Sequence, residues 1–226
     1  KSIRQYLLPL PDFVVADFGT TIYHVDEEQA WSVQQGWHKD IAKDWQGKTR
    51  SDIEHILRGI DSLRLQEHSK QGEFKLSYYV PVYVDQHRLK KDMQSRLDAE
   101  NIRARLIWSI DELANIGLLD VLPERASKYH ALEALMKMQG YDTGDSVFCG
   151  DSGNDIEVLA SPIPAVLVAN SLPAVRNEAL ELARASGNTG QLYICEGGFQ
   201  GMNGNYSAGM LEGIAHYYPH IVNWLK

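Results

Sequence analysis

The sequence predicts an α/β protein with a Rossmann-like parallel sheet and a smaller α+β module inserted into it. Three observations support this. Strands alternate with helices after residue 127, an apolar strand runs into a polar loop at residues 150–155, and residues 27–120 mix helices with strands of antiparallel type. Strand–helix alternation is typical of parallel sheets. We therefore expect residues 1–26 and 121–226 to form the sheet domain and residues 27–120 the insert.

The first part of the chain alternates short apolar runs with turn residues. Residues 1–8 are predicted to be the end of a helix, because Pro9 and Pro11 follow and interrupt it. Residues 13–16 predict a short buried strand, and residues 22–24 predict a second strand after a turn.

The insert contains apolar residues at helical spacing and also short runs typical of strands. Apolar residues at helical spacing predict one helix around residues 53–63 and another over residues 86–100, whose apolar face is Leu89, Met93 and Leu97. The strands predicted here are a bent strand or strand pair at 74–84, then 105–110 and 118–123.

The last hundred residues repeat the order of helix and strand, which carries the prediction of a parallel sheet. The predicted helices cover residues 128–138, 154–160, 173–186 and 206–217. The predicted strands cover residues 145–149, 165–169 and 191–194, and a loop covers 197–205.

Composition excludes some classes of partner. The 226 residues carry a net charge of −8, which argues against binding to nucleic acid or to an anionic membrane. No apolar run approaches the length of a membrane span. The two cysteines, Cys149 in an apolar strand and Cys195, make no disulfide framework and fit a reducing cytoplasm.

The polar loop at residues 150–155 carries the main chemical signal. Asp151 and Asp155 lie in one loop after a strand, and two carboxylates this close repel each other unless a cation lies between them. Hard oxygen ligands in an open loop suit Mg²⁺, which takes one or two carboxylates together with water and a substrate phosphate. Gly150 and Gly153 permit unusual backbone geometry here. The sequence therefore predicts a Mg²⁺ and phosphate site.

Lys128 is predicted to open a helix about 20 residues before this loop. A lysine is poorly placed for the helix dipole at that position. We interpret it as an ammonium that neutralises a carboxylate and a phosphate together.

Lys128 and the Gly150–Asp155 loop resemble the third and fourth motifs of the haloacid dehalogenase superfamily of phosphatases. The insert resembles the cap of the subgroup whose cap follows the second motif, and within that subgroup the chain is most similar to the sucrose-phosphate phosphatases. The stretches that carry the resemblance are residues 19–24, 74–78, 121–128, 147–155 and 208–216.

The resemblance implies roles for individual residues. Asp151 would ligate Mg²⁺, and Asp155 would support the metal directly or through water. Asn154 would donate a hydrogen bond toward the phosphate, and Lys128 would hold the nucleophile and the phosphoryl oxygens. The residues expected near the substrate are Gly19 and Thr20 in the cleft, Lys75 and Ser77 in the cap, and Asn170 after the strand ending at Ala169.

The chain departs from the family pattern at the nucleophile. The family mechanism uses an Asp-x-Asp-x-Thr loop whose first Asp forms an aspartyl-phosphate and whose second Asp acts as acid and base. The printed sequence has no such loop. Asp17 offers a partial match, with Gly19 in place of the second Asp. Against it, no strand followed by a Ser or Thr phosphate site appears where it should, and residues 49–51 lie in a polar stretch with no apolar strand before it. We favour matching residues 13–24 to the segment after the second motif, which places the nucleophile upstream of Lys1.

The expected function is Mg²⁺-dependent hydrolysis of a sugar phosphate, first of all sucrose 6-phosphate. The resemblance also allows mannosylfructose, glucosylglycerol or mannosylglycerate phosphates. Without the nucleophile, the printed chain by itself is expected to be inactive. An alternative is an inactive sugar-phosphate-binding or regulatory domain, like those joined to sucrose-phosphate synthases, and a third reading is a module that only holds a cation. The sequence leaves the oligomeric state open.

Overall fold

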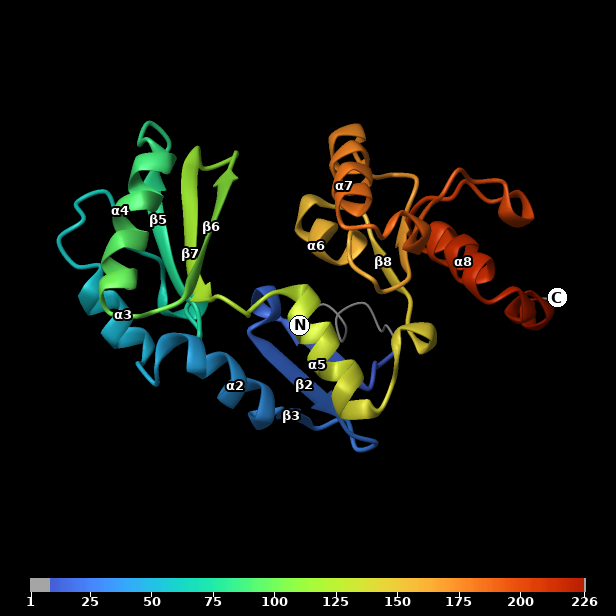
Figure 1. Ribbon diagram of the computed structural model, residues 1–226, viewed down its shortest axis with the longest axis horizontal. Helices are drawn as coiled ribbons and strands as arrows, with labels where there is room; N and C mark the ends of the chain where they lie inside the picture. The colour runs from blue at the N-terminus through green and yellow to red at the C-terminus, as the bar shows by residue number, and fades with distance from the viewer. Residues whose placement is uncertain (1–8, 226) are drawn as a thin grey trace. The chain divides into compact units, whose positions relative to one another are not determined.

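A computed structural model describes residues 9–225, so the helix end predicted at residues 1–8 lies outside the described residues. The chain divides into two compact units, Lys1–Ala131 and Leu132–Lys226 (Figure 1). Helix α5 (Lys128–Gln139) spans the division, and each unit is described here by itself. Within the described residues, no helix is both long and apolar enough to cross a membrane.

The first unit begins with an antiparallel three-stranded sheet. Its strands are β1 (Phe13–Ala16), β2 (Thr21–Val25) and β3 (Trp31–Val33), in the order β1-β2-β3. The first two strands confirm the sequence prediction, whereas β3 was not predicted. Because β3 pairs with β2, the predicted domain boundary after residue 26 falls inside a sheet. The division into a sheet domain (residues 1–26 and 121–226) and an insert (residues 27–120) stays a prediction.

A tight turn joins β1 to β2. Asp17, Phe18 and Gly19 have φ values of 50°, 59° and 94°, which are in the left-handed region. The chain returns at once as the antiparallel partner of β1, with Ala16 opposite Thr21. Asp17 therefore lies in a hairpin turn and not between a parallel strand and a helix.

The second sheet of this unit is antiparallel, in the order β4-β5-β7-β6. The strands are β4 (Arg64–Leu65), β5 (Leu76–Pro81), β6 (Ala104–Asp111) and β7 (Ile116–Pro123). Residues 74–84 thus contain one strand and no internal pair. Helix α4 (Gln86–Ala99) buries Leu89, Met93 and Leu97, as its spacing predicts.

Two helical features of this unit differ from the prediction. The helix expected around residues 53–63 is α3 (Arg50–Ile56) and ends early. Leu57 is its C-cap, whose N–H still donates to the Ile53 carbonyl, and Gly59 follows with a φ of 84° in the left-handed region. Helix α2 (Gln35–Ala42) was not predicted, because most of its residues are polar and its buried apolar residues, Trp37 and Ile41, are too few to show a helical period.

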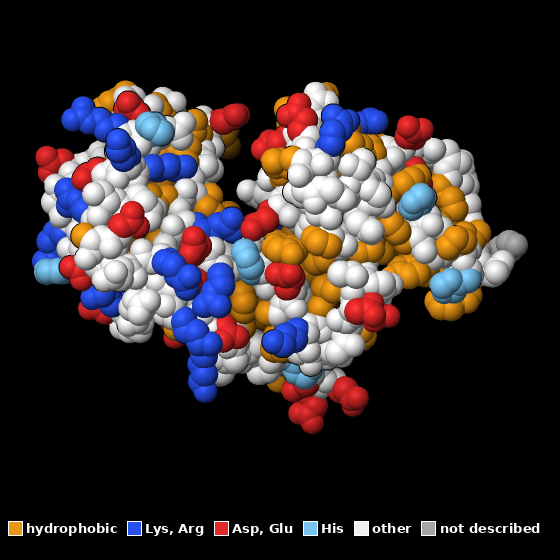
Figure 2. All heavy atoms as spheres, viewed as in Figure 1, with side chains coloured by type: hydrophobic (Ala, Val, Ile, Leu, Met, Phe, Trp, Pro, Cys, Tyr) orange, Lys and Arg blue, Asp and Glu red, His pale blue; other side chains and the backbone are white. Residues whose placement is uncertain are grey.

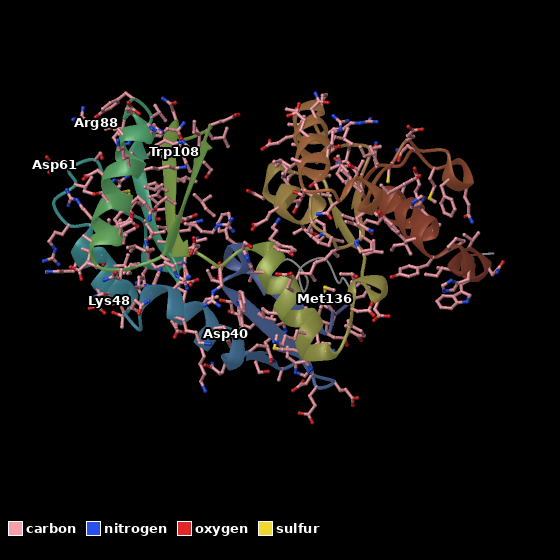
Figure 3. All side chains as sticks on the ribbon, in the orientation of Figure 1. Asp40, Lys48, Asp61, Arg88, Trp108 and Met136 are labelled. Atoms are coloured by element: carbon pink, nitrogen blue, oxygen red, sulfur yellow. The ribbon has the colours of Figure 1, made fainter. Side chains whose placement is uncertain are left out.

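Charged side chains of both signs are interspersed over the face of the first unit seen in Figure 2. On the sheet itself, Trp108 of β6, labelled in Figure 3, lies over Gly117 of β7, where an added Cβ would come within 2.6 Å of the indole ring. Glycine at position 117 therefore makes room for the tryptophan side chain.

The second unit contains the predicted parallel sheet, in the order β10-β9-β8. The strands are β8 (Phe148–Gly150), β9 (Ala165–Leu167) and β10 (Leu192–Ile194). Each is shorter than the predicted apolar run, and residues 143–145 form a 3-10 turn instead of the start of β8.

Helices cover both faces of this parallel sheet (Figure 1). Ala165 and Leu167 pack with Leu159 of α6 (Ile156–Leu159) and Ala179 of α7 (Pro173–Ala185). The alternate residue Val166 packs on the opposite face, with Tyr217 of α8 (Tyr206–Tyr217). The period of two along β9 thus places apolar side chains in two cores, which is typical of an α/β layer structure.

Two glycines let α8 approach this sheet closely. A Cβ added at Gly213 would overlap the side chain of Val166, and one added at Gly209 would come within 2.8 Å of Val168. The glycines are four residues apart and therefore lie on one face of the helix.

Candidate active site

The candidate site lies at the carboxyl edge of the parallel sheet in the second unit. Gly150, Leu167 and Ile194 are in register, so their three strands end at the same level. Asp151 follows the first of these strands and Asn170 follows the second. Open parallel sheets bind ligands at this edge.

Asp155 is the buried anchor of the loop. Asp155 is 5% exposed. Its Oδ2 accepts hydrogen bonds from the N–H of Asp151 at 3.2 Å and from the N–H of Ser152 at 3.1 Å. The Ser152 hydroxyl donates to the same oxygen at 2.9 Å. A Cβ at Gly150 would come within 2.9 Å of the Asp155 carboxyl, so a glycine is needed where β8 ends. Three donors on one oxygen make Asp155 the residue that fixes the loop.

Asp151 is the exposed carboxylate of the loop. Its Oδ2 accepts a hydrogen bond from Nδ2 of Asn170 at 3.2 Å. Oδ1 of Asn170 in turn accepts from the N–H of Tyr206 at 2.7 Å, at the first residue of α8. The Asn170 amide therefore links the Asp151 carboxylate to the first residue of α8. Sequence analysis did not select Tyr206, because only the folded chain brings its N–H to Asn170.

A pocket of about 230 Å³ opens beside Asp151. Its lining comes from the end of β8, from Val168 after β9 and from the first turns of α8: Cys149, Gly150, Asp151, Val168, Tyr206, Ser207 and Met210. Cys149 is half-buried, and burial raises the pKa of its thiol to about 11. The thiol is thus neutral near pH 7, and Asp151 is the anionic side chain of this pocket.

The loop offers carboxylate oxygens, the kind of ligand that Mg²⁺ takes. In residues 9–225, no three His, Cys, Asp or Glu side chains gather in a way that could hold a metal ion by themselves. The loop offers the exposed Asp151 and the buried Asp155. This fits Mg²⁺, which usually takes one or two carboxylates and completes its shell with water and phosphate oxygens.

Asn154 and Lys128 are the two residues that the resemblance assigns to the phosphate. Asn154 is exposed in the 3-10 turn Gly153–Asp155, beside the two carboxylates. Lys128 is the half-buried first residue of α5 and belongs to the first unit.

The turn after β1 lies against the start of α5. A Cβ on Gly19 would overlap the main chain of Ser127 and come within 2.9 Å of the N of Lys128. The Gly19 carbonyl also accepts a hydrogen bond from Nε1 of Trp37 at 2.8 Å. The Thr20 hydroxyl is buried and donates to the Asp17 carbonyl at 3.0 Å. Gly19 thus lies against the start of α5, and Thr20 is bonded within its own turn.

Lys75 and Ser77 lie together on β5 and the segment before it. Both interact with Asp120 of β7, which sequence analysis did not select: the Ser77 hydroxyl donates to its carboxylate, and Nζ of Lys75 lies 3.8 Å from it. The signal available in the sequence was the polar Asp120 within an otherwise apolar strand, Leu118–Pro123.

Solved structures with the same arrangement define the class. The sucrose-phosphatase of Synechocystis sp., solved in complex with sucrose and phosphate, superposes with a TM-score of 0.67 at 24% identity, over 96% of this chain and 78% of that one. A haloacid dehalogenase-like hydrolase of Bacillus subtilis superposes with a TM-score of 0.60 at 17% identity, over 95% of this chain and 71% of that one. The fold is therefore that of the haloacid dehalogenase hydrolases.

The family model for sucrose-6F-phosphate phosphohydrolase matches residues 1–218. The chain belongs to this family, and its homologues include sucrose-phosphatases. A HAD-like hydrolase of Nitrosococcus oceani is 48% identical over 226 residues, which are all of this chain and 60% of that protein. Sucrose-phosphatase 2 of Nicotiana tabacum is 27% identical over 214 residues, 91% of this chain and 44% of the tobacco protein. The chain thus spans less than two thirds of these two relatives.

Proposed function

We propose that this chain is part of a Mg²⁺-dependent phosphatase that hydrolyses a sugar phosphate, with sucrose 6-phosphate as the first candidate. The observation that carries the proposal is the loop at residues 150–155, in which a buried Asp155 holds an exposed Asp151 at the edge of a parallel sheet. Membership of the sucrose-6F-phosphate phosphohydrolase family supports the class of substrate.

In this proposal Asp151 ligates the metal, which when bound neutralises charge on the phosphoryl oxygens. Asp155 acts through the loop, because its Oδ2 is already shared by three donors. Asn170 orients the Asp151 carboxylate by the hydrogen bond at 3.2 Å, as partners behind a metal ligand commonly do.

The remaining predicted residues are assigned to the phosphate and the sugar. Lys128 binds a phosphoryl oxygen as a cation at the start of α5, and Asn154 donates a hydrogen bond to the phosphate. Gly19, Thr20, Lys75 and Ser77 are assigned to the surroundings of the sugar.

Catalysis by this class of enzyme needs an attacking carboxylate. The phosphoryl group moves from the sugar oxygen to an aspartate and then to water, which releases the sugar and inorganic phosphate. No Asp-x-Asp-x-Thr sequence occurs in the printed chain, so we assign this step to an aspartate upstream of Lys1.

The test is phosphate release from a panel of sugar phosphates by the full-length protein, with and without Mg²⁺. We expect turnover of sucrose 6-phosphate that EDTA abolishes. Asp151→Asn should reduce kcat by at least ~100-fold and leave the unfolding transition nearly unchanged, since Asp151 is exposed. Glu178→Gln, on the exposed side of α7, serves as the matched control and should keep full activity.

The same measurement separates the alternatives. Absence of Mg²⁺-dependent turnover on every member of the panel would refute the proposal that the protein is a phosphatase. Tight binding of a sugar phosphate without turnover would instead support a regulatory domain. Binding of Mg²⁺ that is not enhanced by phosphate would support a module that only holds a cation.

A further inference from the structure

A buried carboxylate lies in the antiparallel sheet of the first unit, where burying a charge is costly unless it is paired. Asp120 of β7 stands opposite Ser77 of β5, and its side chain is 9% exposed. Its Oδ1 accepts the Ser77 hydroxyl and faces Nζ of Lys75 at 3.8 Å. Both polar neighbours of Asp120 are thus residues that the family resemblance places near the sugar.

Ser77 and Lys75 are held from the other side by the segment before β5. The Ser77 N–H donates to Oε1 of Gln71 at 2.8 Å, and Nε2 of Gln71 donates to the Ser77 carbonyl at 2.9 Å. The Lys70 carbonyl accepts from Nζ of Lys75 at 3.2 Å, and the Ser77 hydroxyl, whose single proton goes to Asp120, lies 3.3 Å from the same carbonyl. The cluster is therefore fixed by several hydrogen bonds and does not depend on one ion pair.

The Lys75 ammonium keeps hydrogen-bonding capacity. Its side chain is 13% exposed, its one hydrogen bond within the described residues goes to Lys70, and the Phe18 ring lies 5.5 Å away. An ammonium has three N–H donors, so two N–H groups of Lys75 can donate to a ligand. On Asp120, Oδ2 has no partner within the part of the chain that the structure describes, although an ionised carboxylate accepts at both oxygens.

We propose that Asp120 is a specificity-determining residue: its carboxylate positions the Lys75 ammonium, and the two together bind a hydroxyl of the substrate's sugar. This rests on the proposed function and deepens it. A hydroxyl both donates and accepts, so it can accept from Lys75 and donate to Oδ2 of Asp120. Because the pair carries no net charge, it suits a neutral polyol and not the phosphate, which a lone lysine would attract.

The experiment compares two substrates of the full-length protein, sucrose 6-phosphate and p-nitrophenyl phosphate, which has no sugar. Asp120→Asn keeps the volume of the side chain and removes its charge. We expect the KM for sucrose 6-phosphate to rise ~10-fold or more, because the hydrogen bonds involve charged groups, while kcat and the kinetics of the small ester stay within twofold. Asp98→Asn, exposed on α4, is the matched control and should change neither substrate.

Lys75→Met should give the same pattern, and the double variant should be no worse than either single variant, because the two residues act as one unit. This second variant keeps the test usable if Asp120→Asn folds poorly. An equal loss on both substrates, or an unchanged KM for sucrose 6-phosphate, would overturn the inference and leave the phosphatase standing.

If the wild-type protein hydrolyses neither substrate, the proposed function fails and binding decides this inference separately. Calorimetry with unphosphorylated sucrose then compares wild type with Asp120→Asn. Binding that weakens ~10-fold or more in the variant supports a polyol site, and equal or undetectable binding in both proteins overturns it.

Discussion

Asp44 is fully buried and holds Arg125, which lies 81 residues further along the chain. Its Oδ2 accepts the main-chain N–H of Arg125 at 2.8 Å, and its Oδ1 accepts the side-chain Nε at 3.2 Å. Arg103 donates to the same carboxylate. Arg125 also donates to the main-chain carbonyl of Asp40, labelled in Figure 3, at 2.7 Å. One carboxylate thus joins the 3-10 turn Lys43–Trp45, which follows α2, to the segment that follows β7.

Removal of this carboxylate should destabilise the first unit. Asp44→Asn keeps the size of the side chain, but it removes the negative charge and turns one acceptor oxygen into an NH2 group that faces the donors of Arg103 and Arg125. We expect a loss of about 2–3 kcal/mol in the free energy of unfolding, near the lower end for buried ion pairs because both arginines reach solvent. Urea denaturation measures it. Asp92→Asn, in an exposed ion pair on α4, should cost under about 0.5 kcal/mol. Equal effects of the two variants would contradict the role of Asp44.

The close approach of α8 to β9 should not tolerate a larger residue. Gly213→Ala adds a Cβ that overlaps Val166, and overpacking of this kind typically costs about 1–3 kcal/mol. Gly36→Ala is the matched control, because Gly36 is exposed in α2 and its added Cβ meets no atom within 4 Å. That variant should be stabilised by up to about 1 kcal/mol. Thermal unfolding followed by circular dichroism distinguishes them, and a Tm for Gly213→Ala at or above that of the wild type would exclude the close contact.

Loss of the hydrogen bond from Asn170 to Asp151 should weaken Mg²⁺ binding more than it lowers the free energy of unfolding. Asn170→Ala removes the donor to Asp151 and the acceptor for the Tyr206 N–H. We expect the Mg²⁺ concentration for half-maximal activity of the full-length protein to rise ~10-fold or more, as is common for partners of metal ligands. Magnesium titration of phosphate release measures this. A changed unfolding midpoint with an unchanged magnesium requirement would assign Asn170 a purely structural role.

Cys195 should be nearly inert in the folded protein. Its thiol is 2% exposed and donates to the Gly209 carbonyl at 3.2 Å, and burial raises its pKa from 9.0 to about 12. The reactive thiolate is therefore much scarcer at pH 8 than for an ordinary thiol. Labelling with iodoacetamide followed by mass spectrometry should modify Cys149 before Cys195, and both rapidly in denaturant.

The same shift gives a pH dependence. Because the folded state holds the Cys195 proton more tightly than the unfolded chain, this contribution to stability is complete below pH 9 and is lost as the pH rises from about 9 to 12. Urea midpoints measured across that range should fall, and less steeply for Cys195→Ala. Midpoints that fall equally in both proteins would show that other groups control the alkaline transition.

Local sequence patterns predicted most of the elements and one part of the site. Leu89, Met93 and Leu97 recur every four residues, so the buried face of α4 follows from helical geometry alone. Strands alternating with helices predicted the parallel sheet of the second unit. The loop at residues 150–155 was found because its carboxylates and glycines are neighbours in the chain. Short or polar elements such as β3 and α2 were missed, since their periodicity is too brief or is masked by charged residues.

The sequence by itself determined the fold class, the edge of the sheet at which the loop lies and the residue types available for Mg²⁺ and phosphate. Only the tertiary structure decided that Asp155 is buried while Asp151 is exposed, because that depends on which donors surround one oxygen. It also decided the pairing of Asp120 with Ser77 and of Asp44 with Arg125, which are 43 and 81 residues apart. Periodicity reports the neighbours of a residue within its own helix or strand. Packing of the chain against itself selects the distant partners that set its burial and its charge.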